Sequence, residues 1–81
     1  MSSNKICKVE LKCKNALMNH VIEELGTNTE ITTIDRDNFM VAAEVDVNFA
    51  FLAWILQFGN DITILSPEFV KNQIHEIAEK I

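Results

Sequence analysis

The stretch that decides the fold is ICKVELKCK, residues 6–14, in which apolar and polar side chains alternate from Cys7 onward. An alternation of period two over this length is typical of a β-strand that buries one of its faces. The odd-numbered side chains should therefore enter a core. The even-numbered side chains, which should face outward, are Lys8, Glu10, Lys12 and Lys14.

The segment after this strand predicts a helix. Asn15 has the short polar side chain that favours an N-cap, and the helix is expected to start at Ala16. Its apolar residues recur at helical spacing, and they are Leu17, Met18, Val21, Ile22 and Leu25. Gly26 is expected to be a structural cap at the C-terminus, since glycine tolerates the positive φ that often ends a helix.

The next segment predicts a β-hairpin. Residues 29–34 are rich in β-branched side chains, residues 35–38 supply turn formers, and residues 39–46 alternate in polarity. Phe39 belongs to the parity of the apolar set. Met40 belongs to the opposite parity and should lie on the outward face.

A second helix is predicted over residues 49–58. Asp46 or Asn48 can cap its N-terminus, and Gly59 is expected to be a structural cap at its C-terminus. Nine of its ten residues are apolar, and Gln57 is the exception. A helix that is apolar all round is covered on more than one side, either by its own domain or by a partner.

The last third of the sequence predicts a short strand around Ile62 and Ile64, followed by a helix. We expect Ser66 to cap this helix with its hydroxyl, Pro67 to occupy the first helical position, and Glu68 to place an acid in the first turn. The apolar residues on one side of the helix are Val70, Ile74, Ile77, Ala78 and Ile81.

The predicted order of elements is β-α-β-β-α-β followed by a terminal helix. Two β-α-β halves joined by a hairpin are typical of the ferredoxin-like α+β arrangement, which has a four-stranded antiparallel sheet. Right-handed crossovers would place the strand of residues 6–14 between the third and fourth strands, with the two main helices on one face. The other face of the sheet is expected to stay open.

Length, composition and charge restrict the function. The 81 residues, of which 48% are apolar and 23% charged, make one small globular domain. The net charge is −5, but the first fourteen residues carry +3 and the remainder −8. Phosphate binding depends on lysine and arginine, so we expect no direct DNA binding by this acidic chain. On the open face we expect cross-strand pairing between lysine and glutamate.

The sequence contains no constellation typical of catalysis, a metal site or a cofactor site. His20 and His75 are not accompanied by other residues at metal-ligand spacing. Glu23 and Glu24 are neighbours on a helix and so point in different directions. Two glycines and no tyrosine leave no glycine-rich phosphate loop and no tyrosine nucleophile. We therefore expect a protein that is not an enzyme and that holds no cofactor.

Cysteine spacing and hydropathy indicate the cell compartment in which the protein is expected. Cys7 and Cys13 should lie roughly 20 Å apart on one extended strand, whereas a disulfide needs Cα atoms within about 7 Å. Both thiols are therefore expected to be reduced. The sequence shows neither a signal peptide nor the roughly 20 apolar residues of a bilayer helix. These features favour a cytoplasmic protein that makes no membrane contact.

The sequence WILQFGNDITILSPEFVK, residues 54–71, resembles the signature of the WCX module, the C-terminal extension of WYL-domain transcriptional regulators. In that family a tryptophan-bearing helix ends in a hydrophobe and a glycine. A short aliphatic strand and a proline follow, and the next helix opens with an acidic residue and soon reaches a basic one. The matching positions are Trp54, Phe58, Gly59, Ile62, Ile64, Leu65, Pro67, Glu68 and Lys71. The upstream half is similar more loosely, from about Lys5.

The resemblance implies a non-catalytic regulatory module of a bacterial DNA-binding regulator. It implies a homodimer, contacts with the WYL barrel and helix-turn-helix domains of a parent chain, and a share in framing the effector site. Family members usually carry an arginine near the position of Lys71, and a lysine there does not offer the bidentate contact that an arginine makes. Without tyrosine the chain has no WYL tripeptide. We therefore expect residues 5–81 to be a separated WCX-like domain and residues 1–4 to be a leader of artificial origin.

The partner is expected to meet the open face of the sheet and the apolar second helix. The candidate interface residues are Lys8, Lys12, Met40, Phe51, Trp54 and Lys71. The alternative is a free-standing ACT-like domain that senses a small molecule and dimerises through its sheet. ACT-like modules share this topology, but their glycine-bearing ligand loop after the first strand is missing here.

Overall fold

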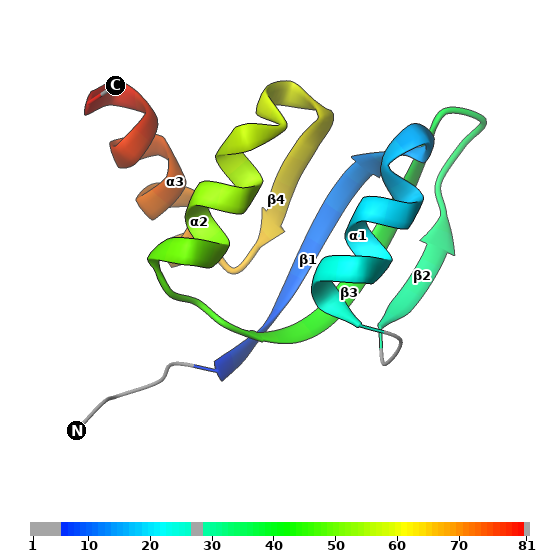
Figure 1. Ribbon diagram of the computed structural model, residues 1–81, viewed down its shortest axis with the longest axis horizontal. Coiled ribbons are helices and arrows are strands. Elements are labelled where there is room, and N and C mark those ends of the chain that lie inside the picture. Colours follow the sequence, from blue (N-terminus) through cyan, green and yellow to red (C-terminus); the bar gives the residue numbers. More distant parts are fainter. Residues whose placement is uncertain (1–5, 27–28, 81) are drawn as a thin grey trace.

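The computed structural model describes residues 6–26 and 29–80, arranged as one sheet with three helices (Figure 1). The predicted leader, residues 1–4, lies outside the described residues. The strands are β1 (Ile6–Lys14), β2 (Glu30–Thr33), β3 (Asn38–Asp46) and β4 (Ile62–Ser66). The helices are α1 (Met18–Leu25), α2 (Phe49–Gln57) and α3 (Glu68–Lys80), with short 3-10 helices η1 (Asn15–Leu17) and η2 (Gly59–Asp61).

The sheet has the strand order β2-β3-β1-β4, and every neighbouring pair is antiparallel. The predicted α+β class with a four-stranded antiparallel sheet is therefore confirmed. So is the position of β1 between β3 and β4. Helices α1 and α2 lie side by side over one face of the sheet, and α3 lies beyond α2, near β4 (Figure 1).

The central pair of strands is longer than its flanking strands. β1 pairs with β3 from Ile6 opposite Asp46 to Lys14 opposite Asn38. The registers of β2 and β4 cover only part of this ladder. Among the strands that the structure describes, residues 6–9 and 43–46 thus pair only with each other, and we call this part the two-stranded extension.

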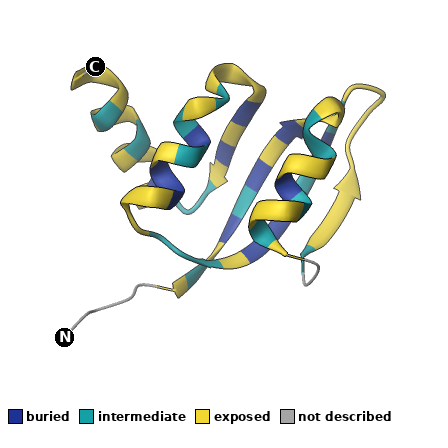
Figure 2. Cartoon of the chain, viewed as in Figure 1, coloured by how far each residue is buried: buried dark blue, intermediate teal, exposed yellow. Residues whose placement is uncertain are grey.

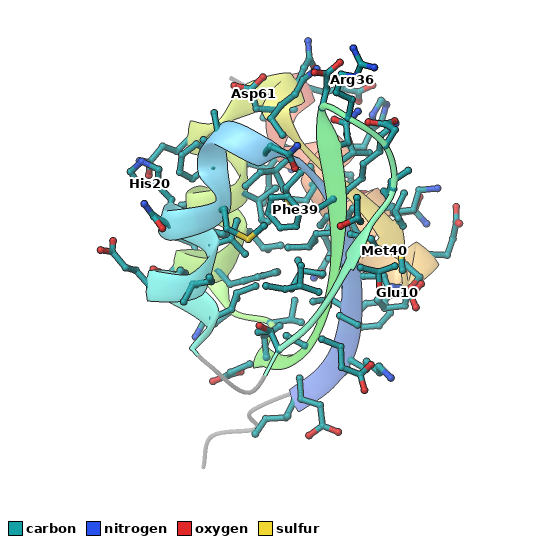
Figure 3. The ribbon with its side chains drawn as sticks, turned by 90° about the vertical axis from the view of Figure 1, so that its right-hand side faces the viewer. Glu10, His20, Arg36, Phe39, Met40 and Asp61 are labelled. Atoms are coloured by element: carbon teal, nitrogen blue, oxygen red, sulfur yellow. The ribbon has the colours of Figure 1, made fainter. Side chains whose placement is uncertain are left out.

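The core lies between the sheet and its helices (Figure 2). Val9, Leu11 and Cys13 of β1 have no exposed surface, as the alternation of the strand predicts. Phe39 of β3 is 1% exposed and points toward the helical layer, whereas Met40 points to the other side of the sheet (Figure 3). The period-two pattern therefore gives the correct inward face for both central strands.

Two helix ends follow their predicted chemistry. The Asn48 side chain accepts a hydrogen bond of 2.9 Å from the Phe51 amide, so the prediction that Asn48 can cap α2 is confirmed. Gly26 ends α1 with a φ of 87°, and its amide donates to the Ile22 carbonyl at 2.8 Å. Gly59, with a φ of 60°, comes two residues after the last residue of α2 and begins η2. Both glycines hold backbone angles that a side chain would disfavour.

The predicted N-cap at Asn15 is wrong. Residues 15–17 form η1, and α1 begins only at Met18. The Asn15 side-chain amide instead donates a hydrogen bond of 2.7 Å to the Arg36 carbonyl in the β2–β3 turn. A partner 21 residues away thus replaces the local capping bond.

The predicted start of the last helix also needs correction. α3 begins at Glu68, so Pro67 precedes the helix, and its carbonyl accepts hydrogen bonds from the Val70 and Lys71 amides. Within the described residues, the Ser66 hydroxyl donates to Glu10 Oε1 at 3.1 Å and makes no bond to the first amides of α3. This hydroxyl therefore ties β4 to β1 instead of capping the helix.

Candidate interaction surface

The open face of the sheet is the strongest candidate surface, because α1 and α2 cover only the opposite face (Figures 1 and 3). β1 contributes Lys8, Glu10 and Lys12 to this face. Lys12 lies opposite Met40 on β3 and opposite Thr63 on β4. An exposed ammonium therefore lies in one row with a half-buried thioether and a hydroxyl.

The charges on the open face are only partly neutralised. Lys8 lies opposite Glu44, but its ammonium comes within 4.0 Å of Glu30 on β2, two strands away. The side chains of this pair are 60% and 81% exposed, so solvent screens the attraction. In the described ranges, Lys12 and Lys14 make no ion pair. The open face therefore retains unpaired positive charge along β1.

The turn between β2 and β3 contains Asp35, whose carboxylate interacts with the positive charge of Lys12. Asp35 accepts hydrogen bonds from the amides of Asp37 and Asn38, each at 2.9 Å, and from the Asn38 side chain at 3.1 Å. The pKa of the Asp35 carboxyl lies below its ordinary value. The hydrogen bond from the Asp37 amide lowers it most, and the two Asn38 donors and the positive charge of Lys12 lower it further. The hydrogen bonds to the Asp35 carboxylate thus stabilise the turn of the β2–β3 hairpin, near the end of β1.

The burial of Phe51 corrects its predicted interface role. Phe51 is 5% exposed and belongs to the core, so it offers no surface to a partner. Trp54 is half-buried and lies between Phe51 and Phe58, with ring centroids 6.4 Å and 5.4 Å away. Phe49, at the first turn of α2, is 73% exposed but is not among the predicted interface residues. Since almost every residue of α2 is apolar, sequence periodicity could not separate its covered side from its exposed side.

Lys71 lies on α3, not on the sheet. Its ammonium is 3.9 Å from Glu68, one turn earlier on the same helix. It lines a hollow between α2, β4 and α3, together with Thr63 and His75. The predicted interface residues thus fall into three groups, which are the open face, the aromatic cluster around Trp54, and this hollow.

The comparison with family models agrees with the signature read from residues 54–71. A model described as the WCX domain matches residues 5–81. The chain belongs to the WCX domain family. The comparisons with curated proteins and with solved structures gave no match.

The two histidines of this WCX domain have different neighbours. The His20 ring lies 5.8 Å from the Phe58 ring, and His75 Nε2 lies 3.1 Å from a carboxylate oxygen of Glu79 on the same helix. In the part of the chain that the structure describes, no three His, Cys, Asp or Glu side chains are grouped so as to hold a metal ion. None of the helices found within residues 6–26 and 29–80 has both the length and the apolar character to span a bilayer.

Proposed function

We propose that this WCX domain is a non-catalytic assembly and regulatory module of a bacterial WYL-type transcriptional regulator. The observation that carries the proposal is an open sheet face with unpaired positive charge in a chain whose net charge is −5. The module packs through this face on the WYL barrel, or on the second protomer of a cytoplasmic homodimer, and helps to frame the effector site. It binds no DNA itself. Its sheet and first two helices take the ferredoxin-like arrangement.

The chemistry of the open face indicates what the partner should present. Lys12 lies beside Met40 and is not paired within the described residues, so an acidic side chain next to an apolar one would complement both. Burying the thioether adds apolar contact, and the carboxylate compensates the ammonium as water leaves. We infer that the partner surface carries acidic residues around a small apolar centre.

The proposal is tested in the full-length regulator with Lys8→Glu combined with Lys12→Glu. Reversing both charges places like charges against an acidic partner, so we expect weaker association between domains or protomers and a reduced response to the effector. The measurements are sedimentation velocity and effector-dependent promoter binding. The matched control is Arg36→Glu combined with Lys80→Glu, which makes the same change in net charge away from the centre of the open face. Unchanged association and response in the first variant would overturn the proposal.

The family match favours this function over a free-standing ACT-like sensor. The segment after β1, where ACT-like modules carry a glycine-bearing ligand loop, is η1 with the sequence NAL and contains no glycine. The sheet face that such a sensor would use for dimerisation remains available for a partner domain.

A further inference from the structure

A hollow of about 280 Å³ lies between α2, β4 and α3. Its apolar lining includes Ile55, Ile62 and Ile64, which are almost fully buried at 2%, 3% and 5% exposed. The accessible apolar part of the lining comes from Leu56 and Ile74, which are half-buried, and from the exposed Ala78. The volume is close to the lower end of ligand pockets, about 300–1,000 Å³, so it suits a small molecule. The hollow therefore offers an aliphatic surface that belongs to neither the open face nor the aromatic cluster.

Its polar lining has an unusual charge for this chain. Lys71 and His75 line the hollow from successive turns of α3, and none of its described lining residues carries a carboxylate. Glu44 lines two other hollows in the described part of the chain, together with Glu30 in one and with Glu24 and Asp46 in the other. Of these three hollows, the one between α2, β4 and α3 therefore has the lining that favours an anion, in a protein of net charge −5.

The side chains of Lys71 and His75 are free to turn toward a ligand at small cost. Lys71 is 45% exposed and reaches Glu68 only at 3.9 Å, and exposed pairs of this kind contribute little to stability. His75 is 76% exposed beside Glu79 and adds a second donor from its ring. Neither glutamate lines the hollow.

We infer that the hollow binds a small amphipathic carboxylate. The aliphatic tail of the ligand lies on Leu56, Ile74 and Ala78, where its burial releases water. The carboxylate of the ligand meets the Lys71 ammonium and the His75 ring at the rim. Ligands with this combination include short-chain and branched-chain monocarboxylates. The inference is independent of the proposed assembly function, because it concerns the isolated domain and a hollow whose described lining has Thr63 in common with the open face but does not include Lys8, Lys12 or Met40.

The experiment is an NMR titration of the ¹⁵N-labelled 81-residue chain with sodium hexanoate, with hexylamine as the probe of opposite charge. Hexanoate should cause saturable amide shifts in residues 62–64 and 71–75, and hexylamine should not. Saturable shifts confined to other residues, equal shifts with hexylamine, or no saturable shift would each overturn the inference.

The matched variants are Lys71→Glu and Lys80→Glu, which reverse the same charge on the same helix inside and outside the hollow. Lys71→Glu should weaken hexanoate binding by at least about tenfold, since attraction at the rim becomes repulsion. Lys80→Glu should keep the affinity of the unchanged chain. Lys71→Gln removes the charge while keeping a long side chain, and it provides the test if Lys71→Glu loses the dispersed spectrum of a folded protein. Equal affinities of a folded Lys71 variant and Lys80→Glu would contradict the inference.

Discussion

The two sides of β1 differ in almost every physical property although they share one backbone. Val9, Leu11 and Cys13 are fully buried against the helices, while Lys8 and Lys12 are exposed on the open face. The first set stabilises the fold through burial, and the second leaves it nearly unaffected. The inward residues of β1 thus stabilise the fold, and we propose that the outward residues of the same strand bind the partner. Substitutions one position apart should therefore separate stability from partner binding.

The largest expected effect is that of Leu11→Ala. Leu11 has no exposed surface at the centre of the sheet, so its truncation leaves a cavity and should lower the free energy of unfolding by about 2–5 kcal/mol. Its neighbour in sequence gives the control, since Lys12→Ala should change stability by less than about 0.5 kcal/mol. Urea unfolding followed by circular dichroism measures both. Similar decreases in the free energy of unfolding of the two variants would show that the two sides of β1 do not differ in their contribution to stability.

The two thiols of β1 lie at different positions along the covered side of the strand. Cys13 is fully buried, and burial raises the pKa of its thiol to about 11, whereas Cys7 is half-buried in the two-stranded extension. Only the thiolate reacts readily, so Cys7 should be alkylated by iodoacetamide at pH 8 at least about tenfold faster than Cys13. Peptide mass spectrometry gives the two rates. The urea-unfolded chain gives the reference rate for each thiol. Equal alkylation rates of Cys7 and Cys13 in the folded protein would show that the protection of a thiol does not depend on its position along β1.

A smaller effect is expected at the turn that joins the edge strand to the sheet. Hydrogen bonds to its carboxylate keep the pKa of Asp35 below its ordinary value of 3.8, so the charged form stabilises the folded state. This contribution is present above the ordinary pKa and is lost as the pH falls through the lowered pKa. The stability difference between the unchanged chain and Asp35→Asn should therefore be greatest near pH 6 and disappear toward pH 2. Thermal unfolding measured across this range tests the sign, and a difference that grows on acidification would refute it.

The smallest effect is expected for the ion pair on the open face. Lys8 and Glu30 are 4.0 Å apart and largely exposed, so a double-mutant cycle with Lys8→Ala and Glu30→Ala should give a coupling free energy below about 0.5 kcal/mol. The coupling should fall further in 1 M NaCl because salt screens exposed charges. A coupling free energy that is larger and independent of salt would mean that the exposed residues of the open face contribute to stability as the buried residues of β1 do.

The sequence predicts those parts of the fold that depend on local periodicity. The alternation in residues 6–14 gives the inward face of β1, and the side chain of Asn48 gives the start of α2. It fails where a polar side chain has a distant partner. Ser66 bonds to Glu10, 56 residues earlier, and Asn15 bonds to the Arg36 carbonyl, so no local pattern could reveal either contact.

The candidate surface is predicted only in part for a related reason. Parity along β1 places the lysines on the open face correctly, because a strand has only two sides. Sequence periodicity could not show that Phe51 is buried, since α2 is apolar on all sides and the orientation of the helix is set by packing. The ion pair between Lys8 and Glu30 also escapes prediction, because it joins strands separated by β3.

The two-stranded extension has a consequence for the motions of the domain. Residues 6–8 and 44–46 of this extension have each other as their only described strand partners and lie outside the buried pair of Val9 and Ala43, so fluctuations can separate them while the core and the four-stranded part stay paired. Such partial opening requires less free energy than global unfolding. Amide hydrogens in the extension should therefore exchange with deuterium sooner than those of residues 10–13, which pair on both sides. The rigid body of the domain thus carries a segment that samples open states while the remainder stays folded.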